Sequence, residues 1–267
     1  MPIECKCPLK KLSQDEFHAI DKVMMGHAFD IHNEFGRFRD ERIYQDELAR
    51  RCAESGLPVL REPMICVKYL DFSKQYFLDV LADSGAICEL KAVRSLNVGH
   101  EMQVINYLLL TELCHGKLVN MRTSSVESRY ISTQLNHEKR RRYIYNLNGK
   151  GTPDPGALRL YDLLNDLLAD WGAFLDIHLY RDAIIHFFGG VDHVIRSMDV
   201  KLGNRTVGKQ KVCMVGEDAA FHLSAIKTHH LSYQKYLMRL LNHSSLIKVH
   251  WINFQGNEIQ FETLERK

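Results

Sequence analysis

The sequence lacks the features that mark several classes of protein. Its 267 residues contain no apolar run near the roughly 18 residues that a membrane span needs. The start, Met1 to Lys6, has no apolar core of a secretory signal. Lys and Arg total 35 against 33 Asp and Glu, so no excess charge marks a polyelectrolyte. The seven cysteines are scattered, as in proteins with reduced thiols. We therefore expect a cytoplasmic globular protein that has no membrane segment.

Several common catalytic and metal-binding signatures are also missing. No glycine-rich phosphate loop, dinucleotide fingerprint or Ser-His-Asp arrangement stands out. The 14 histidines show no metal-ligand spacing, and Cys5 and Cys7 have no second half that would complete a zinc site.

The length predicts two domains, because 267 residues exceed one average domain. A stretch rich in Gly, Pro and Asn at residues 146–156 is the best linker candidate. We expect a first domain at 1–145 and a second at 157–267. In the first, Ser13 to Glu16 reads as a capping box that opens a helix ending at Gly36. The remaining order, helix, three strands, helix and strand, predicts a mixed α/β sheet.

A predicted hairpin carries the candidate chemistry. Extended residues 76–81 lead through a turn at 82–85 into a strand at 86–93. If the turn centres on Ser84, paired residues sum to 168 and Asp79 faces Glu89, while Lys91 shares the face of Glu89. Facing carboxylates repel, and a hard cation such as Mg²⁺ or Mn²⁺ would relieve the repulsion. The alternative is an exposed hairpin with a Lys–Glu ion pair and no metal.

Together with the helix that begins near His100, these strands resemble the core of the PD-(D/E)XK nuclease superfamily. The stretch Phe38-Arg39-Asp40-Glu41-Arg42-Ile43-Tyr44 also resembles the motif of the bacterial GxxExxY family within it, with Phe38 in place of the first glycine. The resemblance covers about residues 15–131. It implies a restriction-endonuclease-like mixed sheet.

The resemblance also implies roles for individual residues. Asp79 and Glu89 would be metal ligands, joined by the backbone carbonyl of Leu90, and Glu41 would be a further acidic ligand. Lys91 would position the attacking water and stabilise the phosphorus. Gln103 would hydrogen-bond near the water or the scissile phosphate. Taken alone, Glu41 could be a solvated helix residue and Gln103 a polar group on a helix surface.

An internal repeat indicates that this fold occurs twice. Five residues recur 136 positions later: Gly36, Phe38, Asp40, Tyr44 and Asp46 as Gly172, Phe174, Asp176, Tyr180 and Asp182. The candidate site does not recur, because Glu41, Asp79, Glu89 and Lys91 align with Ile177, Met214, His222 and Ser224. We expect a tandem pseudo-duplication whose second copy is not catalytic. It could pack on the first as an intramolecular pseudo-dimer.

The sequence therefore favours an Mg²⁺- or Mn²⁺-dependent nuclease, acting on DNA in preference to RNA. The basic run Lys139 to Arg142 could contact phosphates or could form a solvated face. Two alternatives stay open: a non-enzymatic module that binds nucleic acid or a protein, and a metal-dependent enzyme acting on a smaller phosphate substrate.

Overall fold

The computed structural model describes residues 3–148 and 154–266, and the chain divides into two compact units, Met1–His137 and Glu138–Lys267. Among the described residues, no helix combines the length and apolar character needed to cross a membrane. The boundary lies before the expected linker, because Ile144–Asn148 forms strand β9 and pairs in parallel with β14 at the end of the chain. Most of the described residues of the predicted linker thus lie in β9 or in the helix Pro155–Trp171, which both belong to the second unit.

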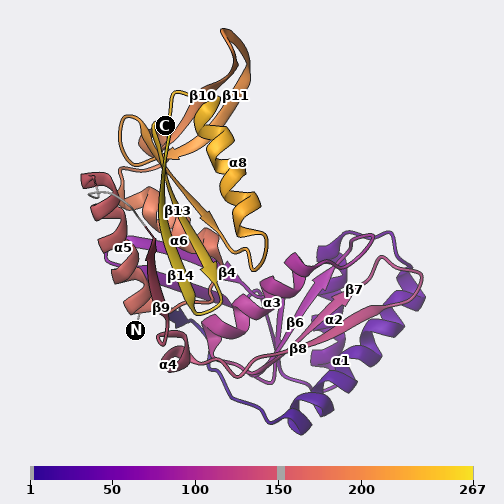
Figure 1. Cartoon of the computed structure of the whole chain (residues 1–267). Helices are drawn as coiled ribbons and strands as arrows, with labels where there is room; N and C mark the ends of the chain where they lie inside the picture. The colour runs from indigo at the N-terminus through magenta and orange to yellow at the C-terminus, as the bar shows by residue number, and fades with distance from the viewer. Residues whose placement is uncertain (1–2, 149–153, 267) are drawn as a thin grey trace. The chain divides into compact units, whose positions relative to one another are not determined.

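The first unit contains a five-stranded mixed sheet, a separate three-stranded sheet and three long helices (Figure 1). The five-stranded sheet has the order β2-β5-β6-β7-β8, and the smaller sheet has the order β1-β3-β4. The helices are α1 (Gln14–Phe35), α2 (Glu41–Glu54) and α3 (Val98–Thr111). The strands are β1 (Ile3–Cys5), β2 (Val59–Arg61), β3 (Met64–Tyr69), β4 (Phe72–Phe77), β5 (Val80–Ala82), β6 (Ala86–Lys91), β7 (His115–Asn120) and β8 (Glu127–Ser132).

Local sequence signals account for the helix that opens the unit. Helix α1 begins after Ser13, whose hydroxyl accepts the Glu16 N–H while the Glu16 carboxylate accepts the Ser13 N–H at 2.8 Å. This is the predicted capping box, and it satisfies two amides that the helix cannot pair internally. The helix ends at Gly36, whose φ of 70° and ψ of −161° lie in a region open mainly to glycine.

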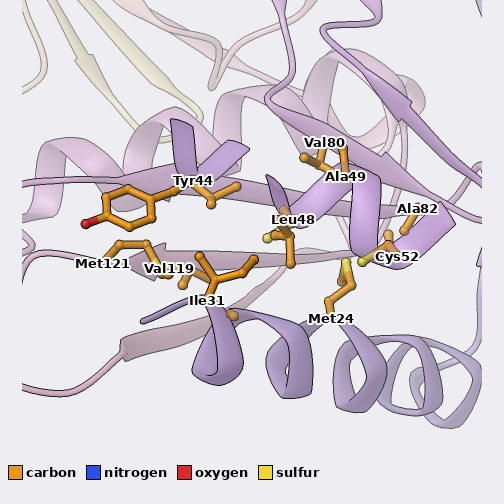
Figure 2. Packing of buried hydrophobic residues seen from close by; sticks show 14 of the residues in the cluster. Met24, Ile31, Tyr44, Leu48, Ala49, Cys52, Val80, Ala82, Val119 and Met121 are labelled. Carbon is orange, nitrogen blue, oxygen red and sulfur yellow. The ribbon is translucent and has the colours of Figure 1, made fainter. Parts of the chain in front are cut away.

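The two faces of the central hairpin are covered by different helices. Alternate residues of β6 (Ala86, Cys88 and Leu90) join a buried cluster with α1 and α2, part of which Figure 2 shows around Met24, Ile31 and Leu48. The intervening residues of β6 point to the other face. Helix α3 lies against β7 there, and a Cβ added to Gly116 would be 2.8 Å from Cγ1 of Val104. Glu89 and Lys91 therefore lie on the α3 face.

The predicted hairpin register is confirmed. Val80 pairs with Cys88, Leu81 with Ile87 and Ala82 with Ala86, so each pair sums to 168. The extended segment at 76–81 is not one strand, however, because β4 ends at Phe77 and β5 begins at Val80. Between them the chain crosses from the small sheet to the large one, and the Asp79 carbonyl accepts the Glu62 N–H at 3.2 Å.

The second unit holds one six-stranded sheet in the order β10-β11-β12-β13-β14-β9. Its helices are α4 (His137–Arg140), α5 (Pro155–Trp171), α6 (Ile177–Phe187), α7 (Val191–Val194) and α8 (His230–Asn242). The α4 helix begins at the last residue of the first unit. The strands other than β9 are β10 (Ile195–Leu202), β11 (Arg205–Met214), β12 (Ala219–Ser224), β13 (Lys248–Gln255) and β14 (Glu258–Glu265).

The two units share a sequence of elements and a pattern of strand pairing. In the first, β5 and β6 are antiparallel, β6 and β7 parallel, and β7 and β8 antiparallel. In the second, β11 and β12, β12 and β13, and β13 and β14 repeat these directions. Small details recur too: the Tyr44 hydroxyl donates to the Gly36 carbonyl, and the Tyr180 hydroxyl to the Gly172 carbonyl. The units differ in that β10 and β11 belong to the main sheet, whereas β3 and β4 form a separate one.

Candidate active site

Three segments of the first unit bring the predicted acidic residues together. Asp79 lies just before β5, Glu89 and Lys91 lie on β6, and Glu41 is the first residue of α2. Asp79 Oδ2 accepts the Leu90 N–H at 2.8 Å, and Glu41 Oε2 accepts the Ala92 N–H at 3.1 Å. Both carboxylates are thus fixed to the backbone beside Lys91.

Lys91 bridges two of these carboxylates. Its Nζ lies 2.6 Å from Glu89 Oε1 and 3.6 Å from Glu41 Oε1. Burial acts to lower the pKa of Lys91, but attraction to Glu89 and Glu41 outweighs it and raises that pKa. Lys91 is therefore held as a cation, which suits it to charge stabilisation and not to the role of a free base.

Glu89 is the most constrained residue of the site. It is 1% exposed, and its Oε2 is buried without a hydrogen-bond partner among the described residues. Burial and, next, repulsion from Asp79 raise the pKa of Glu89 to about 8. Burial also raises the pKa of Asp79, against the lowering effect of the Leu90 N–H. A buried carboxylate whose pKa is raised by burial and by a neighbouring carboxylate is typical of a functional site.

Gln103 is hydrogen-bonded to a tyrosine of its own helix. Its Nε2 donates to the Tyr107 hydroxyl at 2.9 Å, one turn further along α3. Burial and, next, the charge of Glu89 raise the pKa of Tyr107 to about 12. Both residues belong to the helix that covers the face of Glu89 and Lys91.

Gln45 was not predicted from the sequence to be part of the site. Gln45 is buried, its Nε2 lies 3.5 Å from Glu41 Oε1, and its amide helps to lower the pKa of Asp79. The signal that could have found Gln45 is its spacing of four residues from Glu41 on the same helix face.

The carboxylates of this site have the chemistry of ligands for a divalent cation. Among the described residues, no group of three His, Cys, Asp or Glu side chains is arranged to hold a metal ion. The donor chemistry nevertheless fits. Lys91 pairs with two carboxylates, Glu89 and Glu41, and Asp79 adds a third carboxylate bound to the neighbouring Leu90 N–H. Glu89 Oε2 is buried without a hydrogen-bond partner among the described residues. Oxygen donors of this kind suit Mg²⁺ or Mn²⁺. A cation would take up the repulsion that now raises the pKa of Glu89 and Asp79.

The basic run after the first unit is not a uniform solvated face. Arg140 is 1% exposed, and its guanidinium donates to the Trp171 carbonyl at 2.8 Å. Arg142 pairs with Glu138 one helical turn earlier. At least one of the four cations is therefore part of the packing of the second unit.

The fold and the site define a mixed α/β unit with an acidic and lysine-containing centre at the end of a central hairpin. The family model of the PD-(D/E)XK nuclease superfamily matches residues 18–131, the stretch that carries Glu41, Asp79, Glu89, Lys91 and Gln103. The match lies within the first unit. No curated protein and no solved structure matches the chain.

Proposed function

We propose that the first unit hydrolyses phosphodiester bonds in nucleic acid with the help of Mg²⁺ or Mn²⁺. The observation that carries this proposal is the convergence of Asp79, Glu89, Lys91 and Glu41 within the region that matches the nuclease superfamily. The GxxExxY assignment, which rests on residues 38–44, and the preference for DNA belong to the same proposal.

The side chains have distinct roles in this proposal. Asp79 and Glu89 would hold the cation, with the Leu90 carbonyl and Glu41 as further oxygen donors. When bound, the cation supplies positive charge against the phosphate oxygens. Lys91, held as a cation between Glu89 and Glu41, moves to the phosphate and stabilises the negative charge of the transition state. Gln103, oriented by Tyr107, donates a hydrogen bond to the water or to the phosphate.

The second unit is proposed to be a non-catalytic copy of the first. The shared order of elements and the shared strand directions support this. Each unit also has an asparagine on the strand that follows its helix: Asn120 after α3 and Asn253 after α8. Lys91 pairs with Asn120 and Ser224 with Asn253, so Ser224 takes the place of Lys91 and His222 that of Glu89. Extending each hairpin register puts Val212, and not Met214, in the place of Asp79. Either residue is apolar, so the position offers no ligand for a hard cation.

The test is a cleavage assay with the purified full chain. Single-stranded DNA, duplex DNA and RNA are incubated with Mg²⁺, Mn²⁺ or EDTA. We expect metal-dependent cleavage that falls by roughly 100-fold or more in Asp79→Asn, Glu89→Gln and Lys91→Met. The matched control is Asp21→Asn, which breaks the ion pair of 2.8 Å between Asp21 and Lys117. The side chains of this pair are about as buried as that of Lys91, but they lie outside the site.

The outcomes separate the candidate functions. Cleavage that survives in Asp79→Asn and Glu89→Gln would refute the proposal, as would the absence of cleavage of all three substrates under either metal. The close Lys91–Glu89 contact of 2.6 Å favours one alternative, a non-enzymatic nucleic-acid-binding module. That module would bind the substrates and cleave none of them.

A further inference from the structure

The β10–β11 hairpin of the second unit is a long two-stranded ribbon with little packing. Figure 1 shows it projecting from the other strands of that unit. All residues from 201 to 211 are exposed. A two-stranded ribbon that buries so little gains little stability from the hydrophobic effect, so packing does not explain its length.

The side chains of this ribbon are strongly basic. Five cations, Arg196, Lys201, Arg205, Lys209 and Lys211, stand against one carboxylate, Asp199. Among the ion pairs of the described residues, none engages any of the three cations of β11. These three charges are therefore available to an anionic partner.

A pocket of about 580 Å³ lies at the base of the ribbon and within the second unit. Its basic lining residues are His178, Arg181, Lys211 and His222, and no Asp or Glu is among the described residues that line it. Arg181 also forms an ion pair of 3.5 Å with Asp182, which is not among the lining residues. The size is that of a site for a small organic ligand or one nucleotide.

Two tyrosines give this pocket aromatic walls. Tyr233 is held in place, because its hydroxyl lies 2.6 Å from His222 Nε2 and its ring stacks on Trp251 at 5.4 Å and 23°. Tyr236 is 61% exposed and lines the pocket, and the Arg239 guanidinium lies over its ring, 5.4 Å from the centroid. Stacking of bases on tyrosines, beside cations that track the phosphates, is the usual way of binding single-stranded nucleic acid.

We propose that the second unit binds a single strand of nucleic acid, with its phosphates on the β10–β11 ribbon and a base in the tyrosine-lined pocket. The pocket is formed partly by α6 and β12, which occupy the places that α2 and β6 have in the first unit. One unit therefore offers carboxylates and a lysine there, and the other offers tyrosines and cations. The binding does not depend on the proposed cleavage.

The experiment measures binding to a chain that cannot cleave. A fluorescein-labelled oligothymidylate is titrated with the full chain carrying Glu89→Gln, in EDTA, and its anisotropy is followed at several salt concentrations. Because no metal is present and no cleavage is needed, a failure of the nuclease proposal leaves this result unaffected.

Two changes test the two parts of the surface. Arg205→Ala with Lys209→Ala should weaken binding by roughly tenfold and lower the salt slope by about 1.4, which is two phosphate contacts at about 0.7 each. Tyr236→Ala should weaken binding by roughly tenfold or more with little change in the salt slope. The matched control is Lys227→Ala with Lys235→Ala, which removes the same charge from exposed positions outside the lining.

Three results would overturn the proposal. The first is no binding at low salt. The second is a loss in the control equal to the loss in Arg205→Ala with Lys209→Ala. The third is duplex DNA that binds as tightly as the single strand, with no effect of Tyr236→Ala. Tryptophan fluorescence of each variant checks that the second unit is folded, since Trp171 and Trp251 both lie there.

Discussion

Asn120 clamps the end of the strand that carries Lys91, and its replacement by alanine should weaken both the fold and the site. The side chain is fully buried. Its Oδ1 accepts the N–H of Val93 at 3.1 Å and that of Arg122 at 3.2 Å, and its Nδ2 donates to the Val93 carbonyl at 2.9 Å. Asn120 thus continues the pairing of β6 with β7 two residues beyond Lys91.

The cost follows from these contacts. Each neutral hydrogen bond contributes about 0.5–1.5 kcal/mol, and the backbone groups of Val93 lose their partner in a partly buried place. We expect Asn120→Ala to lower the free energy of unfolding by about 2–4 kcal/mol. Lys91 lies two residues before Val93, the residue that Asn120 holds. The Lys91 ammonium group should therefore lose its fixed position in Asn120→Ala, and the proposed cleavage should fall.

The second unit offers a matched control. Asn253 is equally buried, its Oδ1 accepts the Ile226 N–H at 2.9 Å, and its Nδ2 donates to the Ile226 carbonyl at 3.0 Å. Asn253→Ala should destabilise its own unit by a similar amount and leave cleavage unchanged. Tryptophan fluorescence in urea reports this loss, because both tryptophans belong to the second unit.

Far-UV circular dichroism in urea measures the effect of Asn120→Ala on stability. Hydrogen exchange followed by mass spectrometry measures protection of the Val93 amide. We expect faster exchange at Val93 and a transition at lower urea. An unchanged exchange rate of the Val93 amide would refute the proposed role of Asn120. So would a loss in the free energy of unfolding below about 0.5 kcal/mol, because that is less than the contribution of one hydrogen bond.

Two further predictions concern stability. Gly36→Ala should lower the free energy of unfolding by about 1–2 kcal/mol through backbone strain alone. Gly172→Ala should lower it more, because the new Cβ would also lie 2.7 Å from Cβ of Arg140. Urea unfolding of both variants tests this order. Burial lowers the pKa of His250, although Asp154 acts to raise it. A histidine whose pKa is lowered by folding contributes stability above its unfolded pKa and loses it as the pH falls below about 6.5, at up to about 1.4 kcal/mol per pH unit. Tryptophan fluorescence in urea from pH 7 to 5 should show this decline, and it should be shallower in His250→Phe.

The site combines unfavourable electrostatics between carboxylates with favourable attraction to a lysine. Burial raises the pKa of both Asp79 and Glu89, and repulsion from Asp79 raises that of Glu89 further, so the site as it stands is electrostatically unfavourable. Lys91 offsets part of this, at 2.6 Å from Glu89. The second unit has the same strand directions in β11, β12 and β13 without a carboxylate or a lysine at His222 or Ser224.

Much of the site followed from local patterns in the sequence. The turn around Ser84 fixed the hairpin register, and the two-residue period of a strand placed Glu89 and Lys91 on one face. The capping box at Ser13 and the glycine at 36 set the ends of α1. These features depend on neighbours a few residues apart, so the order of residues alone is enough to specify them.

Only the tertiary structure decided which distant segments meet. It joined β9 to β14, which moved the boundary between the units to His137 and Glu138. It also brought Glu41 to the Ala92 N–H. Such contacts depend on how helices and strands far apart in the chain pack and pair. The sequence by itself therefore determined the candidate residues, and the packing of α2 and α3 around the sheet decided their environment and their pKa values.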